Sequence, residues 1–341
     1  MTASDLASTA TALVAPGKGI LAADESFPTI EKRFKSINLE STEENRRAYR
    51  DMLFTTKGLG EFISGVILFD ETIRQATADG TSFAELLARN GVIPGIKVDT
   101  GAKDLALHPG EKVTEGLDGL RGRLTEYVGL GAKFTKWRAV ITIGNGIPTE
   151  YCIAANAHAL GRFAALSQEQ GLVPIVEPEV LMDGDHSIDR CYEATKATLT
   201  RLFEELSVTR VSLEGALLKT NMVLSGKDAS QRAGVEEVAE RTVKCLKETV
   251  PAEIPGIVFL SGGQGDEEAT AHLNAMNKVP DRGPWELSFS YGRALQAPAL
   301  EAWKGDPSNV EAAQRALFHR AKLNGAARSG SYTEEMEHEA A

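Results

Sequence analysis

Several charged residues stand at or near the carboxyl ends of short apolar runs, where ionisable side chains are rarely found. Glu177 follows VPIV, Lys136 follows AKFT and Lys219 follows EGALL, while Asp24 and Lys97 end similar runs. An isolated charge in a protein core costs several kcal/mol, roughly, unless it is paired. Ionisable groups are tolerated where buried strands emerge at one rim and face the loops that bind substrate. The pattern therefore predicts a catalytic site built from strand ends.

Three of these positions have an ionisable neighbour two residues away. Successive side chains of a strand alternate, so residues two apart leave the same face. The pairs are Lys97 with Asp99, Lys136 with Arg138 and Glu177 with Glu179. Adjacent carboxylates raise the apparent pKa of one of them and nearby lysines lower it, so this mixture suits proton transfer near neutral pH. The alternative is that these groups are rim ion pairs that merely satisfy one another.

Lys219 is the candidate nucleophile. It closes an apolar run and precedes Thr220 and Asn221. A partly desolvated lysine beside a second cation is able to react as the neutral amine, attack a ketone and form an imine. Lys136 is a candidate for that second cation. The alternative is a lysine that extends its ammonium group to the rim and only packs its aliphatic stem.

The segment GIVFLSGGQGDEEA contains a candidate phosphate site. Ser261, Gly262 and Gly263 follow an apolar run and precede a predicted helix over 266–274. Glycines let backbone N–H groups approach an oxyanion closely, and a helix N-terminus favours negative charge. Arg293 follows the last predicted strand, where it could complete the site. Because an SGG turn alone is common, its position after the seventh predicted strand is what indicates a phosphate site.

These groups must be positioned by an alternation of short apolar runs and amphipathic segments. Strands are predicted at 19–24, 63–69, 93–98, 134–138, 173–178, 211–218, 256–261 and 286–290. Helices, from apolar residues at three-and-four spacing, are predicted at 42–56, 82–90, 149–170, 187–206 and 231–249. Alternating strands and helices imply parallel pairing, and eight such units predict an α/β fold, a (β/α)8 TIM barrel. In such barrels the loops after the seventh and eighth strands usually bind phosphate.

The two ends of the chain are expected to lie outside the barrel. Residues 1–18 and 300–323 are predicted to form extra helices, so a single barrel domain is expected over 1–323. From Asn324 onward the sequence is polar and has few apolar anchors. This composition predicts a mobile C-terminal tail over 324–341.

The composition favours a globular protein whose main partner is neither nucleic acid nor a membrane. Hydrophobic residues make up 42% and the mean hydropathy is -0.18, with no membrane span expected. The N-terminal sequence lacks the pattern of a secretory or transit peptide, so a cytoplasmic location is expected. A formal charge of -11 and a pI near 5.2 disfavour nucleic acid and anionic membranes as partners. A local basic pocket remains compatible with a small anionic substrate.

Cysteine and histidine usage argues against a metal site. Cys152, Cys191 and Cys245 are widely spaced and odd in number, which favours buried free thiols over a disulfide framework or a thiolate site. The six histidines show no HxxxH or HxH grouping of the kind that binds zinc. We therefore expect neither a metal nor another cofactor.

Nine ordered segments resemble the signature of class I, Schiff-base fructose-bisphosphate aldolases, over almost the whole chain. They are GKGILAADES, ESTEENRR, GVILFDET, PGIKVDTG, AKFTKWR, PIVEPEVL, LEGALLKTNMV, FLSGGQ and SFSYGRALQ. The resemblance implies reversible cleavage of fructose 1,6-bisphosphate to dihydroxyacetone phosphate and glyceraldehyde 3-phosphate, in glycolysis and gluconeogenesis. It also implies a lysine imine in place of a metal, and a homotetramer.

The resemblance further implies roles for individual residues. Lys219 matches the imine-forming lysine, Glu177 the main acid/base and Asp24 the carboxylate near the scissile bond, and the supporting catalytic positions are Lys136 and Glu179. The basic substrate-site positions are Arg33, Arg46, Lys97 and Arg138. The positions that match the site of the C1 phosphate are Ser261, Gly262, Gly263, Ser290 and Arg293.

The sequence departs from the family pattern in two places. Phe27-Pro28-Thr29 stands where the family often has Thr-Gly-Ser, which bears on the hydroxyl and backbone contacts to the second phosphate. Animal members end in a tyrosine that assists proton transfer to the enamine, whereas this chain ends Glu339-Ala340-Ala341. Tyr332 aligns with an earlier tail tyrosine and is not assigned that role. Water or another group is expected to carry the proton.

Two other functions compete with aldol cleavage. A different Schiff-base barrel lyase, such as a transaldolase, would share the strand-end lysine but would not need two phosphate-binding clusters. A barrel retained only as a binding scaffold would tolerate the loss of Lys219 or Glu177. Both residues are present.

Overall fold

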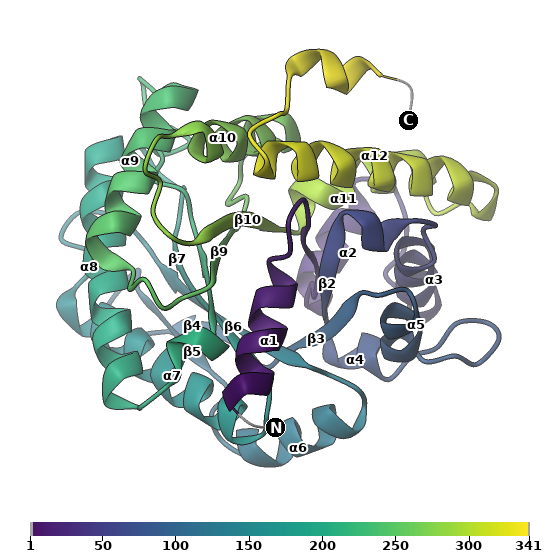
Figure 1. The fold of residues 1–341 in the computed structure, drawn as a ribbon, viewed down its shortest axis with the longest axis horizontal. Helices are drawn as coiled ribbons and strands as arrows, with labels where there is room; N and C mark the ends of the chain where they lie inside the picture. The colour runs from purple at the N-terminus through teal and green to yellow at the C-terminus, as the bar shows by residue number, and fades with distance from the viewer. Residues whose placement is uncertain (1–2, 340–341) are drawn as a thin grey trace.

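The central feature of the computed structural model, which describes residues 3–339, is a closed barrel of parallel strands (Figure 1). In order around the barrel the strands are β1 (Gly19–Ala23), β10 (Glu286–Tyr291), β9 (Gly256–Phe259), β8 (Leu217–Thr220), β7 (Val173–Val180), β6 (Phe134–Ile141), β3 (Ile93–Lys97) and β2 (Ile63–Leu68). β1 pairs with both β2 and β10, so the first and last strands close the ring. The predicted (β/α)8 fold is confirmed.

Helices surround the strands and explain much of the sequence periodicity. They are α2 (Phe27–Lys35), α3 (Glu43–Phe54), α4 (Asp70–Ile73), α5 (Phe83–Arg89), α6 (Leu120–Gly129), α7 (Glu150–Glu169), α8 (Ile188–Val208), α9 (Val235–Thr249), α10 (Asp266–Lys278) and α11 (Arg293–Trp303). Thr42, Ser82 and Ser187 each begin a helix by accepting a backbone N–H with the side-chain oxygen. The helices predicted from periodicity are present, with ends shifted by four residues or fewer.

Helix α1 (Ala3–Leu13) closes the amino end of the barrel. Its side chains Leu6, Ala10 and Leu13 are buried in one cluster with interior side chains of the barrel, among them Phe134 at the start of β6. In Figure 1 this helix crosses the centre of the ring of strands. Because apolar side chains fill this end, the opposite end, where the strands point toward their following loops, is the one that can hold a polar site.

The sixth barrel strand differs from the prediction over 211–218. Leu213–Gly215 form one turn of 3-10 helix, η2, and β8 begins after it, so Lys219 lies inside the strand rather than beyond its end. β6 and β7 are longer than predicted, and Arg138 and Glu179 stand within them. The predicted strands ended too early because charged residues interrupt the apolar runs, whereas the backbone pairing of β6 with β7 continues past them to Ile141 and Val180.

Several elements near the first half of the barrel were not predicted, among them the short helix α4. An antiparallel hairpin of β4 (Gly101–Asp104) and β5 (Lys112–Glu115) follows β3. Helix α6 contains Gly122, which lowers helix propensity. Helix α2 is short and carries Pro28 in its first turn, a position that tolerates proline because the N–H there has no helical partner.

The C-terminal helical region also needs correction. The single helix predicted over 300–323 is divided between α11 and α12 (Val310–Arg328), because Lys304 adopts a left-handed conformation that ends α11. The residue at which the mobile tail was predicted to begin, Asn324, falls within a helix. That residue lies inside α12, is fully buried and accepts a hydrogen bond of 2.7 Å from the Thr270 hydroxyl.

Residues 329–339 fold back onto α10 and α12. The backbone of Tyr332 exchanges two hydrogen bonds, of 3.1 and 3.2 Å, with the side chain of Asn274. The Tyr332 hydroxyl donates to Glu337, in the 3-10 turn η4 (Glu334–His338), and Glu337 forms an ion pair with Arg320. Polar residues in this segment, whose composition predicted a mobile tail, thus bind partners on the two helices. Ala340 and Ala341, on which the expectation about the chain end rests, lie outside the described residues.

Two smaller expectations concern burial and membranes. Cys152, Cys191 and Cys245 are free thiols and are buried. Over residues 3–339, no helix combines the length and apolar character that crossing a bilayer requires.

Candidate active site

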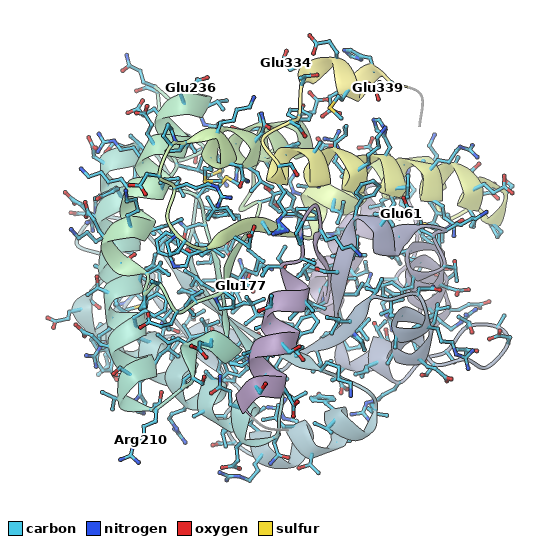
Figure 2. The ribbon with its side chains drawn as sticks, in the orientation of Figure 1. Glu61, Glu177, Arg210, Glu236, Glu334 and Glu339 are labelled. Carbon is cyan, nitrogen blue, oxygen red and sulfur yellow. The ribbon has the colours of Figure 1, made fainter. Side chains whose placement is uncertain are left out.

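A cavity of about 390 Å³ lies at the carboxyl ends of the barrel strands. Its lining comes from six strands, β1, β3, β6, β7, β8 and β10, from the loops after β1, β7, β9 and β10, and from α2 and the start of α11. The structure brings together every predicted site residue except Arg46: Asp24, Arg33, Lys97, Lys136, Arg138, Glu177, Glu179, Lys219, Ser261, Gly262, Gly263, Ser290 and Arg293. Figure 2 shows Glu177 near the middle of the molecule, whereas Glu236 and Glu334 lie at its periphery.

Lys136 is the centre of a buried charge cluster. Its Nζ lies 2.6 Å from a carboxylate oxygen of Asp24 and 3.2 Å from Oε2 of Glu177. The other oxygen of Glu177 lies 3.1 Å from Nζ of Lys219. Lys219 is 4% exposed, so the alternative in which its ammonium group extends to solvent is wrong. Two lysines and two carboxylates thus form one contact network at the strand ends.

The lysines dominate the electrostatics of this cluster. Burial raises the pKa of Asp24, but the charges of Lys136 and Lys219 outweigh burial and bring that pKa to about 2. Burial likewise raises the pKa of Glu177, and the same two lysines hold it below its ordinary value. For Lys136, burial lowers the pKa, and Asp24 and Glu177 raise it well above the ordinary value. At neutral pH both carboxylates are therefore ionised and Lys136 is a cation.

The Asp24 carboxylate should leave a measurable mark on acid stability. Its pKa falls from 3.8 to about 2 on folding, so its ionised form stabilises the fold by about 2 kcal/mol. Because the folded-state pKa is the lower one, this contribution is complete above pH ~5 and is lost as the pH falls toward ~2. We expect the free energy of unfolding, from urea titrations, to fall less steeply with acidification in Asp24→Asn than in the wild type. Parallel curves for the two proteins would contradict the assigned ion pair.

The remaining charges on the strands are paired with partners on neighbouring elements. Arg138 donates to Glu179, and Lys97 pairs with Asp99 in the loop after β3. Asp99 also accepts the backbone N–H of Arg138 at 3.1 Å. These groups satisfy one another, as the ion-pair alternative expected, and Lys97, Arg138 and Glu179 line the cavity as well. The two interpretations are therefore compatible.

One end of the cavity has the features of an anion site. Gly262 and Gly263 have φ values of 54° and 98°, the left-handed region that glycine adopts at least cost. Helix α10 begins just after this loop, and α11 begins at Arg293, directly after β10. The buried hydroxyl of Ser290 makes no hydrogen bond within residues 3–339. The N-terminus of α11, the Arg293 side chain and the Ser290 hydroxyl thus line this end of the cavity beside the glycine loop.

The other end contains the segment that departs from the family pattern. Ser26 precedes α2, and Thr29 lies in its first turn, with their hydroxyl oxygens 3.3 Å apart. Both residues line the cavity together with Lys97 and Arg138. The substitution by Phe27-Pro28-Thr29 therefore retains a hydroxyl at this end of the site.

Arg46 does not line this cavity. Its Nε and Nη2 donate to the carboxylate of Glu71 at 2.7 and 2.6 Å, and its guanidinium lies 4.7 Å from the centre of the Phe27 ring. The position on α3 directs the side chain toward α4 and the start of α2 instead. No sequence signal distinguished this arginine from those that do line the cavity.

Glu25 is a lining residue that was not predicted from the sequence. Its carboxylate accepts from Arg33, from Arg50 at 2.6 Å and from Gln296 at 2.8 Å. This buried carboxylate orients Arg33, which the sequence did identify. The available signal was its place directly after Asp24 in AADES.

Known proteins resemble this chain over nearly all of its length. A family model described as glycolytic, fructose-bisphosphate aldolase class-I, matches residues 5–341. The probable fructose-bisphosphate aldolase class 1 of Xanthomonas campestris pv. campestris is 62% identical, over 97% of this chain and 99% of that protein. The chain belongs to the class I fructose-bisphosphate aldolase family. It is a glycolytic fructose-bisphosphate aldolase, as the signature segments predicted.

Further relatives extend the aldolase comparison. The Arabidopsis thaliana protein named fructose-bisphosphate aldolase 4, cytosolic, is 53% identical over 93% of this chain and 81% of that protein. A solved structure of the Plasmodium falciparum aldolase, in complex with TRAP and a small molecule inhibitor, has a TM-score of 0.95 at 50% identity. It covers 97% of this chain and 95% of that chain. The aldolase barrel is thus matched in fold as well as in sequence.

Proposed function

We propose that Lys219 forms the imine with the C2 ketone of fructose 1,6-bisphosphate. The observation that carries this proposal is the 3.1 Å contact between Nζ of Lys219 and Glu177 inside the cavity. Glu177 accepts the proton that the attacking amine loses and returns it to the hydroxyl that leaves C2 as water. The protonated imine then withdraws electrons from the C3–C4 bond.

Bond cleavage needs a base at the C4 hydroxyl and a charged environment for the departing aldehyde. Either Glu177 or Asp24 removes the hydroxyl proton, and the electron pair of the C3–C4 bond passes into the imine to form an enamine. Lys136, which contacts both carboxylates, keeps them ionised for this step. Protonation of the enamine at C3 and hydrolysis then release dihydroxyacetone phosphate and restore the Lys219 amine.

The substrate phosphates are assigned to the two ends of the cavity. The C1 phosphate lies against Ser261, Gly262, Gly263, Ser290 and Arg293. The second phosphate lies near Ser26, Thr29, Lys97 and Arg138, and Arg33 adds positive charge to the site. Two separated anion sites favour a ketose bisphosphate over the substrates of a transaldolase.

Arg293→Ala tests the phosphate assignment separately from the carbon chemistry. A charge-assisted contact contributes roughly 1.5–3 kcal/mol, so binding of dihydroxyacetone phosphate should weaken about ten- to a hundredfold. Residual turnover of an unphosphorylated ketose should change little, because Lys219 is intact and this substrate lacks the contact. The exposed Arg315 of α12 provides a matched control variant, Arg315→Ala. Equal losses on both substrates would remove the phosphate role from Arg293.

Neither a metal nor an organic cofactor is assigned to the reaction. The imine serves as the electron sink that a metal supplies in other aldolases. Over residues 3–339, no three His, Cys, Asp or Glu side chains are grouped so as to hold a metal ion.

We also propose a cytoplasmic homotetramer of single-domain subunits, with sugar phosphates as ligands and no nucleic acid or membrane partner. The cytosolic name of the Arabidopsis relative supports the location. Leu107 and Tyr151, at 98% and 57% exposed, are apolar surface that association of subunits could cover. The formal charge of -11 supports the absence of a polyanionic partner.

A further inference from the structure

Gln264 connects the two parts of the proposed C1 phosphate site. Its side chain is buried, and Nε2 donates to the carbonyl oxygen of Ser261 at 2.8 Å. The main-chain carbonyl oxygen of Gln264 accepts a 2.6 Å hydrogen bond from Nη2 of Arg293. The side-chain bond folds the loop after β9, and the main-chain bond orients the arginine that follows β10. The position of Gln264 therefore decides where both phosphate-binding parts lie.

His272 holds the side chain of Gln264 from the second turn of α10. The imidazole is 3% exposed, and its Nδ1 lies 2.6 Å from Oε1 of Gln264. An amide oxygen accepts but does not donate, so Nδ1 carries the hydrogen and the bond fixes the tautomer. Burial lowers the pKa of His272 to about 4, with the charge of Glu268 opposing and that of Arg232 adding to this effect. The ring is therefore neutral at physiological pH.

The loop has few side chains to fix its conformation. Gly262 and Gly263 adopt positive φ values, and Gly265 precedes α10. Glycine loses more conformational freedom on ordering than any other residue, so a glycine-rich loop is ordered by the contacts of its few side chains. Gln264 is the most deeply buried side chain of this loop, and His272 is its partner on the helix.

We infer that His272 is a positioning residue for the C1 phosphate, which acts through Gln264 on the 261–263 loop and on Arg293. It does not line the cavity, and it needs no contact with substrate. The inference rests on the proposed phosphate role of Arg293. It predicts a residue whose loss changes phosphate affinity while imine formation at Lys219 continues.

His272→Leu tests this role, because it removes the hydrogen-bond donor and puts an apolar side chain in its place. Loss of one buried hydrogen bond should raise KM for fructose 1,6-bisphosphate about two- to tenfold with kcat nearly unchanged. Competitive inhibition by inorganic phosphate should weaken by a similar factor. Borohydride trapping of unphosphorylated dihydroxyacetone on Lys219 should proceed as in the wild type.

Two further variants separate positioning from general destabilisation. His272→Asn retains a donor in place of Nδ1 and should recover most of the lost phosphate affinity. Thr270→Val removes the buried hydrogen bond to Asn324 from the opposite side of α10, since residues two apart on a helix point about 200° apart. It should lower the melting temperature without changing inhibition by phosphate.

The outcomes distinguish this inference from the function on which it rests. If Arg293→Ala impairs phosphorylated and unphosphorylated substrates equally, the phosphate assignment itself fails. If Arg293→Ala is selective but His272→Leu leaves KM and phosphate inhibition unchanged, the inference for His272 is overturned. It is also overturned if Thr270→Val weakens phosphate inhibition as much as His272→Leu does.

Discussion

Lys219→Ala should lower kcat/KM for fructose 1,6-bisphosphate by more than about 10⁴-fold, because the nucleophile of the covalent pathway is gone. The thermal transition should remain cooperative, since the side chain lies at the cavity wall. Lys196→Ala is the matched control. That lysine pairs with Glu248 on the surface of the helical layer, and its loss should leave turnover unchanged.

Borohydride reduction in the presence of dihydroxyacetone phosphate locates the imine directly. The wild-type protein should yield one modified peptide, which contains Lys219, and Lys219→Ala should yield none. Peptide mass mapping that found the adduct on Lys97 or Lys136 would refute the assignment. Global unfolding of Lys219→Ala would instead indicate a structural role for the lysine.

The second large effect is expected for Glu177→Gln, which keeps the shape of the side chain and removes its basicity. General acid–base catalysis contributes about 10²–10⁴-fold, so kcat should fall by a factor in this range with a smaller change in KM. Borohydride trapping should slow as well, because Glu177 lies 3.1 Å from the attacking amine and serves its proton transfers.

A control for the loss of a buried carboxylate is available far from the cavity. Glu205 on α8 is buried and pairs with Arg201 and His158. Glu205→Gln should affect stability and leave kcat unchanged. If Glu177→Gln retained wild-type kcat, proton transfer would have to be reassigned to Asp24.

Charge at the ends of apolar runs located the central charged residues of the site, because burying a charge is tolerated there and at few other places. That argument found Lys219, Glu177 and Lys136 from local sequence. Arg46 came from the family resemblance instead, and the structure directs its side chain to Glu71 rather than into the cavity. The strand-end argument also missed His272, since a histidine within a helix carries no local sign of the loop that it contacts.

The boundaries of elements were less predictable than their existence. The strand over 211–218 was placed too early because Leu213–Gly215 belong to an apolar run and form a 3-10 turn instead. The polar sequence after 323 has the composition of a solvated tail. Its polar groups instead bind specific partners, such as Thr270 for Asn324 and Arg320 for Glu337.

The helix that closes the amino end of the barrel has a consequence for the order of folding. Its apolar face, with Leu6 and Leu13, is buried only against a ring that β1 and β10 complete by pairing. Arg328, at the end of α12, donates to the carbonyl oxygens of Val14 and Lys18 just beyond that helix. Contacts between residues so distant in sequence form late, because closing a long loop first costs chain entropy. We therefore expect α1, which leaves the ribosome first, to keep its apolar face exposed until the last strand is made, and such exposure favours aggregation of the nascent chain.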